Sequence, residues 1–362
     1  MGQKRLMKGN EALAEAAIRA GVQGFFGYPI TPQSELLEYM SKELPDRGGT
    51  FVQAESEIAS INMVYGAAGA GARVMTSTSS PGFSLMQEGI SYLACTEIPC
   101  VIVNVMRGGP GLGTIQPSQG DYFQAVKGGG HGDYQLIVLA PNSVQEMANF
   151  AFLGFDLADT YRVPVLILAD GALGQMMESV EFPDYVVKEH LTDKTEWATT
   201  GRINGREQHI LTSLHLQPED MEKINKILQR KYREIEAKEV RYETLFTDDA
   251  DLLIVAYGLS SRVSHKALEL ARKEGLKVGL LRPQTLYPFP STALNNFADK
   301  VKKILVVEMS AGQMVEDVQL AVEGKIPVEF YGRMGGMIPQ PDDILEKLRK
   351  MNGSKIKSAL NV

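Results

Sequence analysis

Two glutamates, Glu55 and Glu57, stand where the apolar segment 51–54 turns into a helical pattern. The helix expected over 56–70 is built almost wholly of small and apolar residues, so a carboxylate that enters it is hard to keep solvated. Such an acid has two possible roles. It either sits at the helix start, where the positive end of the helix dipole favours it, or lies in a dry pocket and exchanges protons. Residue type alone favours the helix start.

Short apolar runs alternate with helical patterns along the first half of the chain. The expected strands cover residues 22–27, 51–54, 73–78, 99–106, 135–140 and 163–168, and the expected helices residues 10–21, 33–44, 56–70, 81–94 and 143–161. This alternation predicts a mostly parallel sheet covered on both faces. Ligands bind outside the carboxyl ends of the strands in such sheets. The two glutamates, the hydroxyls of residues 76–80 and Arg107 all fall at those ends.

Length and composition predict a globular protein of two domains. The chain has 362 residues, of which 44% are hydrophobic and 22% charged, and its net charge is −7. These values argue against disorder and leave no basic surface for nucleic acid. No apolar run reaches the length of a membrane span, and the N-terminus has no signal segment, so we expect a cytoplasmic protein.

The alternation of strands and helices breaks between residues 184 and 246. This stretch holds the single tryptophan, Trp197, and a highly charged helical pattern over 218–245. Alternation then resumes to the end of the chain. We therefore predict a three-layer α/β domain over residues 1–183, a connector over 184–246 and a smaller three-layer α/β domain over 247–362.

The common cofactor motifs do not occur in this sequence. The two cysteines, Cys95 and Cys100, are too few for an iron–sulfur cluster and lack a neighbouring histidine for zinc, so we interpret them as buried thiols. The glycines of 66–71 and 108–113 do not follow the dinucleotide-binding pattern, and the P-loop pattern is absent. We expect neither a Rossmann site, nor a P-loop, nor a metal site on this chain.

Five motifs resemble the α subunit of the 2-oxoacid:ferredoxin oxidoreductases, and they occur in the same order over nearly the whole chain. They are Tyr-Pro-Ile-Thr-Pro at 28–32, Ala-Glu-Ser-Glu-Ile-Ala at 54–59, Thr-Ser-Thr-Ser-Ser-Pro-Gly-Phe-Ser-Leu-Met at 76–86, Val-Asn-Val-Met-Arg at 103–107 and Val-Glu-Met-Ser-Ala-Gly-Gln-Met-Val at 307–315. The runs at 117–123, 127–134 and 332–339 resemble the branched-chain enzyme, which acts on 3-methyl-2-oxobutanoate (2-oxoisovalerate), more than the pyruvate enzyme. A 2-oxoglutarate or pyruvate enzyme stays an alternative.

The resemblance implies thiamine diphosphate chemistry, with a pyrimidine-binding first domain and a second domain like the C-terminal domain of transketolase. In this family a glutamate hydrogen-bonds the cofactor pyrimidine, which then removes the thiazolium proton. Glu57 matches this catalytic residue, whereas Glu55 keeps the helix-start role. The resemblance also places six residues beside the cofactor: Tyr28, Pro29, Ile30, Ser77, Thr78 and Ser79.

Thr31 and Arg107 match the family residues that contact the 2-oxoacid. A guanidinium at a strand end suits a substrate carboxylate, because it offers a planar fork of two donors. The alternative for Arg107, less favoured, is a surface arginine, and an equally good alternative for Thr31 is a turn residue that caps the helix at 33.

The sequence lacks one half of a thiamine diphosphate site. Thiamine enzymes usually hold the diphosphate and Mg²⁺ with Gly-Asp-Gly and a later Asn-Asn; here Asn295 and Asn296 form the second pattern, but the first is absent. The resemblance therefore implies a β subunit that holds the diphosphate and Mg²⁺, and a small ferredoxin-like subunit that carries iron–sulfur clusters, with or without a γ subunit. The implied reaction converts a 2-oxoacid, coenzyme A and oxidised ferredoxin to acyl-CoA, CO₂ and reduced ferredoxin.

Two other classes stay open at this point. One is a subunit of a non-redox thiamine enzyme, whose pyrimidine domain follows the same logic. The other is a scaffold subunit without catalytic residues.

Overall fold

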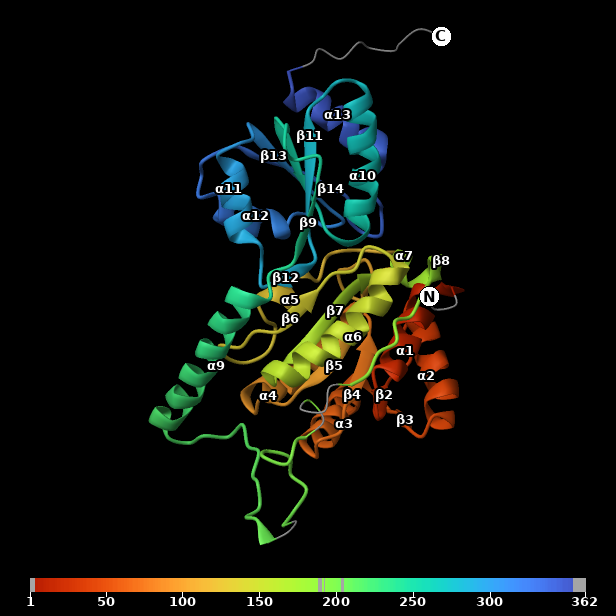
Figure 1. Ribbon diagram of the computed structural model, residues 1–362, viewed down its shortest axis with the longest axis vertical. Helices are drawn as coiled ribbons and strands as arrows, with labels where there is room; N and C mark the ends of the chain where they lie inside the picture. Colours follow the sequence, from red (N-terminus) through yellow and green to blue (C-terminus); the bar gives the residue numbers. More distant parts are fainter. Residues whose placement is uncertain (1–3, 188–190, 192, 203–204, 354–362) are drawn as a thin grey trace.

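The computed structural model describes residues 4–187, 191, 193–202 and 205–353. In these residues two sheets lie one above the other along the long axis, each between layers of helices (Figure 1). The first sheet has seven strands in the order β12-β6-β7-β5-β4-β2-β3, and the second has five in the order β14-β13-β10-β11-β9. The predicted fold class, two three-layer α/β domains, is confirmed.

The first sheet comes largely from the segments predicted as strands. Its members are β2 (Gly24–Gly27), β3 (Thr50–Gln53), β4 (Val74–Thr78), β5 (Cys100–Met106), β6 (Ile137–Leu139), β7 (Pro164–Asp170) and β12 (Thr285–Tyr287). Neighbouring strands are parallel, except that β12 runs antiparallel to β6. Every residue of β4, β5 and β7 is buried, as expected when helices cover both faces.

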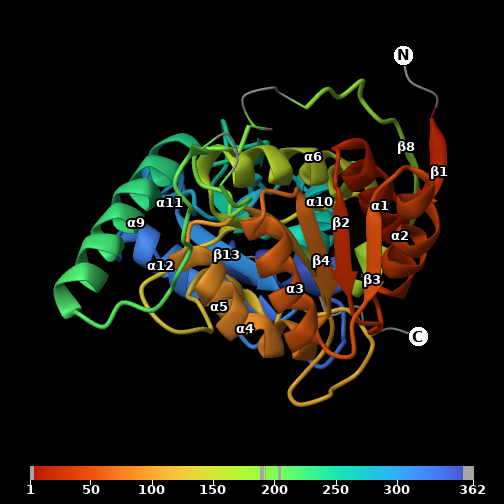
Figure 2. The same ribbon diagram turned by 90° about the horizontal axis from the view of Figure 1, so that it is seen from below.

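Helices cover the two faces of this sheet in separate groups. One face carries α1 (Gly9–Arg19), α2 (Ser34–Asp46) and α6 (Val144–Tyr161), and the other carries α3 (Glu57–Gly69) and α4 (Ser80–Cys95). Figure 2, a view from below, shows α3 and α4 across the strands from α1 and α6. Side chains of β5 alternate accordingly, with Val103 in the first core and Ile102 in the second. Two short helices, α5 (Tyr122–Val126) and α7 (Gly171–Gln175), complete the domain.

The second sheet contains β9 (Tyr242–Leu245), β10 (Leu252–Val255), β11 (Val278–Pro283), β13 (Lys303–Glu308) and β14 (Val328–Gly332). Its helices are α10 (Gly258–Lys273) and α13 (Pro341–Met351) on one face, with α11 (Ser291–Ala298) and α12 (Met314–Val322) on the other. One apolar cluster continues from α3 and α4 into this domain, and the rings of Tyr122 and Tyr257 meet in it with centroids 5.9 Å apart. The two domains therefore share a core.

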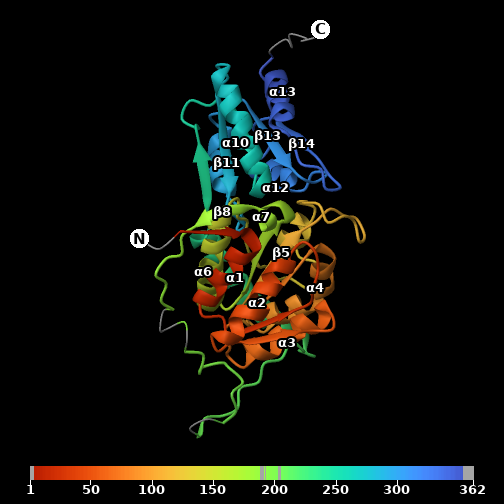
Figure 3. The ribbon, with the colours of Figure 1, turned by 90° about the vertical axis from the view of Figure 1, so that its right-hand side faces the viewer.

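The segment between the domains differs from the prediction in one respect. The expected helix over 218–245 ends early: α9 spans Pro218–Lys238, and Tyr242–Leu245 forms β9 at the edge of the second sheet, antiparallel to β11. Residues 242–245 form a strand because they pair with β11, and local sequence does not reveal that pairing. Residues 206–217 have no regular structure and run below the first domain in Figures 1 and 3. The boundaries at 183/184 and 246/247 stay a prediction.

Two further strands, β1 (Arg5–Lys8) and β8 (Met177–Val180), form a separate antiparallel pair beside the first sheet. Among the helices that the structure describes, none combines the length and the apolar character needed to cross a membrane.

Candidate active site

The two glutamates of the opening motif point in different directions. Ser56 caps α3, and its hydroxyl accepts the N–H of Ala59 at 3.2 Å, so the helix begins at Glu57. Glu57 is buried, with 5% of its surface exposed, whereas Glu55 is exposed before the cap. Among the described residues, no side chain hydrogen-bonds or ion-pairs with the Glu57 carboxylate, which faces the space left by Gly82. Its buried carboxylate is therefore free to meet a ligand.

Glu57 and Thr78 meet at Gly82, in the first turn of α4. A Cβ atom at Gly82 would lie 2.1 Å from Thr78 Oγ1 and 2.5 Å from Glu57 Oε1, closer than real Cβ contacts allow. The glycine therefore leaves the space that the two polar groups share. We call Glu57, Thr76, Thr78, Ser79 and Gly82 the strand-end cluster, because they gather around the carboxyl end of β4.

The hydroxyls of the strand-end cluster lack partners. Thr76 Oγ1, Thr78 Oγ1 and Ser79 Oγ are all buried, and none has a hydrogen-bond partner among the described residues. A buried hydroxyl without a partner costs roughly 1–3 kcal/mol. Such groups are rare in native proteins unless a ligand or water satisfies them. Thr78 lies beside Glu57 at Gly82, and Thr76 and Ser79 are close to Thr78 along the chain, so the carboxyl end of β4 is the best candidate for a polar ligand.

Ser77 does not join this cluster. Its side chain lies on the other face of β4, where the hydroxyl donates to Gln33 Oε1 at 2.6 Å. Gln33 Nε2 in turn donates to the carbonyl of Tyr28 at 3.2 Å. Ser77 therefore contacts the loop after β2, in which Tyr28 and Ile30 are half-buried and Pro29 is exposed.

Thr31 and Arg107, predicted to contact one substrate, are brought together. Arg107 Nη1 donates to the Thr31 carbonyl, and Nη2 to the Leu112 carbonyl, each at 2.9 Å, while the buried Nε has no partner. The Thr31 side chain is exposed. Gln33 is the N-cap of α2, so Thr31 does not cap that helix. Arg107 is half-buried with a fixed guanidinium, unlike an ordinary surface arginine.

A cavity of about 480 Å³ lies beside Arg107, between the two domains. The first domain contributes Ser80, Arg107, the glycine-rich loop 108–112 and Asp121, and the second contributes Met309, Ser310, Ala311, Gln313 and Met334. Burial raises the pKa of Asp121, although hydrogen bonds from Ser80 and Asn104 partly oppose this. Sequence analysis gave no site role to Gly82, Asp121 or the second-domain wall, although the runs 76–86, 117–123, 307–315 and 332–339 contain them, because only the fold brings these runs together.

The cysteines contribute nothing to this site. Burial raises the pKa of the Cys95 and Cys100 thiols, so they are poor nucleophiles at neutral pH. No group of three or more His, Cys, Asp or Glu side chains that could hold a metal ion occurs in the part of the chain that the structure describes.

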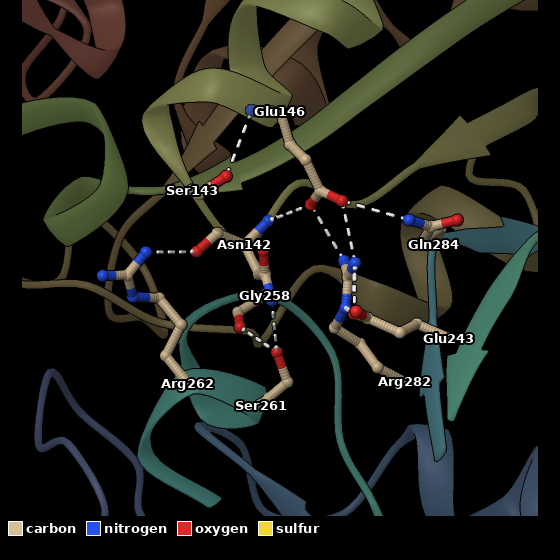
Figure 4. Close-up of polar contacts among 9 residues, drawn as sticks. All are labelled: Asn142, Ser143, Glu146, Glu243, Gly258, Ser261, Arg262, Arg282 and Gln284. Carbon is tan, nitrogen blue, oxygen red and sulfur yellow. Dashed lines mark hydrogen bonds and ion pairs between the residues drawn. The ribbon is translucent and has the colours of Figure 1, made fainter. Parts of the chain in front are cut away.

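A second polar region joins the two domains beyond β6 and β7 (Figure 4). Arg282 forms a two-pronged ion pair with Glu146 at 2.8 and 2.9 Å, and its Nε donates to Glu243 at 2.9 Å. Gln284 donates to Glu146 at 3.0 Å, and Arg262 donates to the Asn142 carbonyl at 3.0 Å. We call this network the interdomain contact, together with Gln119, which donates to the Tyr257 carbonyl, and Asp170, which accepts from the main chain of Leu259.

Comparison with known proteins gives matches over both domains. Residues 15–243 match the family described as pyruvate flavodoxin/ferredoxin oxidoreductase, thiamine diphosphate-binding. Residues 250–344 match the family described as pyruvate:ferredoxin oxidoreductase core domain II.

Two curated relatives match over almost their full length. The ketoisovalerate oxidoreductase subunit VorB of Methanothermobacter thermautotrophicus is 54% identical over 349 residues, which cover 96% of this chain and 98% of the relative. The 2-oxoglutarate synthase subunit KorA of Methanothermobacter marburgensis is 40% identical over 377 residues, which cover 97% of this chain and 100% of the relative.

Two solved structures share the fold. A 2-oxoglutarate:ferredoxin oxidoreductase from Magnetococcus marinus, with 2-oxoglutarate, coenzyme A and succinyl-CoA bound, matches with a TM-score of 0.86 and 29% identity, over 96% of this chain and 65% of that one. A split-gene transketolase, an inactive β4 tetramer, matches with a TM-score of 0.60 and 14% identity, over 98% of this chain and 100% of that one. The second match shows the fold alone, and it agrees with the expected transketolase likeness.

Proposed function

The chain belongs to the 2-oxoacid:ferredoxin oxidoreductase family, as an α subunit, and on this premise we propose how it takes part in oxidising 3-methyl-2-oxobutanoate (ketoisovalerate). The reaction is a thiamine diphosphate-dependent oxidative decarboxylation to acyl-CoA and CO₂, in which ferredoxin accepts the two electrons. One observation carries the assignment of the site: the strand-end cluster gathers a buried carboxylate and three buried hydroxyls that have no partner among the described residues.

The strand-end cluster fits the pyrimidine half of thiamine diphosphate. A heteroaromatic ring with nitrogen and amino groups can satisfy both a carboxylate and several hydroxyls, which an apolar ligand cannot do. We assign the pyrimidine to Glu57, with Thr78 and Ser79 beside it. The loop with Tyr28, Pro29 and Ile30 flanks this edge after β2, whereas Ser77 acts on that loop through Gln33.

We assign proton transfer to Glu57. When bound, thiamine diphosphate would supply a carbon nucleophile for the 2-oxo group and an electron sink for the decarboxylation. Glu57 would hold a proton at its carboxylate for transfer to the bound pyrimidine, and its burial limits the access of competing water. The fixed start of α3 sets its position, since the Ser56 cap determines where the helix begins.

Arg107 is the residue that orients the 2-oxoacid. Its guanidinium lines the cavity of about 480 Å³, and the carbonyls of Thr31 and Leu112 fix its direction. An ionised substrate carboxylate matches this fork in charge and shape. We propose that Thr31 contributes its exposed hydroxyl to the same carboxyl group.

We propose that partner chains complete the enzyme. The sequence has no Gly-Asp-Gly, so we assign the diphosphate and Mg²⁺ to a β subunit. The two cysteines are too few for an iron–sulfur cluster, so we assign the clusters to a small ferredoxin-like subunit, with or without a γ subunit, that passes electrons to external ferredoxin. We also propose that the enzyme is cytoplasmic, as the sequence analysis predicts.

A substrate assay tests this function. The purified complex is given 3-methyl-2-oxobutanoate, pyruvate or 2-oxoglutarate, with coenzyme A and a dye as electron acceptor. We expect the highest kcat/KM with 3-methyl-2-oxobutanoate. A preference for 2-oxoglutarate would overturn the substrate and leave the site assignment intact, whereas turnover without dye reduction would indicate a non-redox thiamine enzyme.

A further inference from the structure

The run 117–123, which contributes Asp121 to the cavity wall, lies between the domains. Gln119, inside this run, is fully buried. Its Oε1 accepts the N–H of Met309 at 2.9 Å and the hydroxyl of Ser260 at 2.7 Å, and its Nε2 donates to the Tyr257 carbonyl at 2.9 Å. All three partners belong to the second domain. The run is therefore fixed by that domain.

A buried carboxylate makes the second-domain side of this contact rigid. Glu308, fully buried at the end of β13, accepts the N–H groups of Met314 and Val315, each at 3.0 Å. This fixes the start of α12 and the loop before it. Gln313, in that loop, donates to the Gly120 carbonyl at 2.7 Å and accepts the N–H of Phe123 at 2.8 Å. Residues 120 and 123 are thus held on either side of Asp121.

Asp121 points away from this contact and toward the site. Its Oδ2 accepts the Ser80 hydroxyl at 2.6 Å and the Asn104 amide at 2.9 Å. Ser80 Oγ then accepts the main-chain N–H of Arg107 at 3.0 Å. The Ser80 hydroxyl has one proton and two acceptors within reach, Asp121 Oδ2 at 2.6 Å and the Arg107 carbonyl at 3.3 Å. The shorter bond to Asp121 directs the proton away from Arg107 and leaves a lone pair for the Arg107 N–H. Hydrogen bonds, together with the main chain of residues 120–123, thus connect the second domain to Arg107.

The direction of the Arg107 side chain depends on this main-chain anchor. The guanidinium is held at its tip by the Thr31 and Leu112 carbonyls, and its Nε has no partner. A shift of the Arg107 main chain therefore pulls the fork away from both carbonyls. Small displacements of a positioning group are costly in active sites.

We propose that Asp121 is a positioning residue for Arg107, and that through Ser80 it makes the orientation of the guanidinium depend on the docking of the second domain. This inference rests on the proposed role of Arg107. Asp121 itself exchanges no proton and need not touch the substrate. It keeps the Ser80 hydroxyl directed so that Arg107 stays in place.

The central test is Asp121→Ala in the purified complex. We expect KM for 3-methyl-2-oxobutanoate to rise about tenfold with little change in kcat, because the fork contributes to binding before the chemical step. Asp121→Asn keeps an acceptor oxygen and should restore most of the affinity. The matched control is Asp317→Asn: Asp317 accepts from Tyr122 at 2.6 Å and pairs with Lys127 across the same domain boundary, but does not contact Ser80. Its KM should stay unchanged.

A double-mutant cycle separates this inference from the proposed function. Arg107→Met alone should raise KM, and adding Asp121→Ala should then have little further effect, because both changes remove one interaction. An unchanged KM in Arg107→Met contradicts the role of Arg107. A raised KM in Arg107→Met together with a normal KM in Asp121→Ala contradicts only the positioning role.

Ser80→Ala keeps the inference testable if Asp121→Ala does not fold. This variant removes the hydroxyl between Asp121 and Arg107 and should give the same rise in KM. A normal KM in folded Ser80→Ala would overturn the proposal.

Discussion

The strand-end cluster and the interdomain contact both lie at the carboxyl ends of the strands of the first sheet, but they differ in whether their buried polar groups have hydrogen-bond partners. Around Arg282 and Gln119, each side chain has charged or hydrogen-bonding partners at 2.7–3.0 Å. Around Glu57, three buried hydroxyls have no partner among the described residues. The paired groups hold the domains together, and the unpaired ones are available to a ligand.

This difference indicates that the interdomain contact mainly stabilises the fold, whereas the strand-end cluster mainly serves ligand binding. Changes in the Arg282–Glu146–Glu243 part of the interdomain contact should lower stability and leave a folded enzyme active. Changes in the strand-end cluster should lower activity and leave stability nearly unaffected, or even improved. Variants in each region test this division.

The largest effect is expected for Arg282→Met. Removing this buried guanidinium leaves Glu146 without its two-pronged partner, which costs about 3–5 kcal/mol of unfolding free energy. Thermal unfolding of the complex measures this, and kcat per folded enzyme should stay normal. Lys302→Met, which removes an exposed pair with Asp251, is the control and should cost under ~1 kcal/mol. Equal losses in the two variants would contradict the comparison.

Asp170 gives the interdomain contact a dependence on pH. It is fully buried, it accepts the N–H groups of Ala172 and Leu173, and burial raises its pKa to about 6. The folded state thus binds its proton more tightly than the unfolded state, so this group's contribution to stability falls as pH rises from about 4 to about 6, by ~3 kcal/mol.

The difference in stability between the wild type and Asp170→Asn isolates this contribution. We expect it to decrease between pH 4 and pH 6, as set by the raised pKa, and to stay level above pH 6. Unfolding midpoints across this range measure it. A difference that grows with pH would mean that the carboxylate is stabilised rather than strained by its surroundings.

In the strand-end cluster, Gly82→Ala should have the strongest effect. The added methyl would overlap Thr78 Oγ1 and Glu57 Oε1, and a displaced catalytic group costs roughly 10²-fold in rate. Steady-state turnover of the complex measures this. Gly154→Ala is the control, because a Cβ there meets its neighbours at an ordinary 3.6 Å. Normal turnover in Gly82→Ala would show that the site lies elsewhere.

The smallest effect is expected for Thr78→Val. Because the hydroxyl has no partner, its loss should leave stability unchanged or raised, while binding of thiamine diphosphate weakens about tenfold, or ~1.4 kcal/mol. Titration of the cofactor into the complex measures this. Ser77→Ala should instead lower stability and leave the affinity for thiamine diphosphate unchanged, because it removes the hydroxyl that donates to the buried Gln33 side chain. Lower stability with normal cofactor affinity in Thr78→Val would contradict the assignment.

Local sequence predicted most of the helices and strands. The family motif distinguished a catalytic role for Glu57 from a helix-start role for Glu55. The structure gives that separation a physical basis, because the Ser56 cap leaves Glu55 outside and Glu57 inside the helix. Apolar runs such as β5 were equally clear, because buried parallel strands are apolar throughout.

Features that depend on distant pairing could not be predicted. Residues 242–245 continue a helical pattern in the sequence, but they form β9 against β11, and β12 returns from the second domain to the first sheet. The role of Asp121 likewise depends on Ser80 and on Gln313, which lie far away in the sequence. The spacing of residues along the sequence does not predict contacts between such distant segments.

The most direct test of the central claim is the exchange of the thiazolium proton of bound thiamine diphosphate for deuterium, followed by NMR in the reconstituted complex. We expect Glu57→Gln to slow this exchange by about 10²- to 10⁴-fold. Glu55→Gln, with the same chemical change at an exposed position, should leave it nearly unchanged. Unchanged exchange in Glu57→Gln with the cofactor still bound would contradict the account.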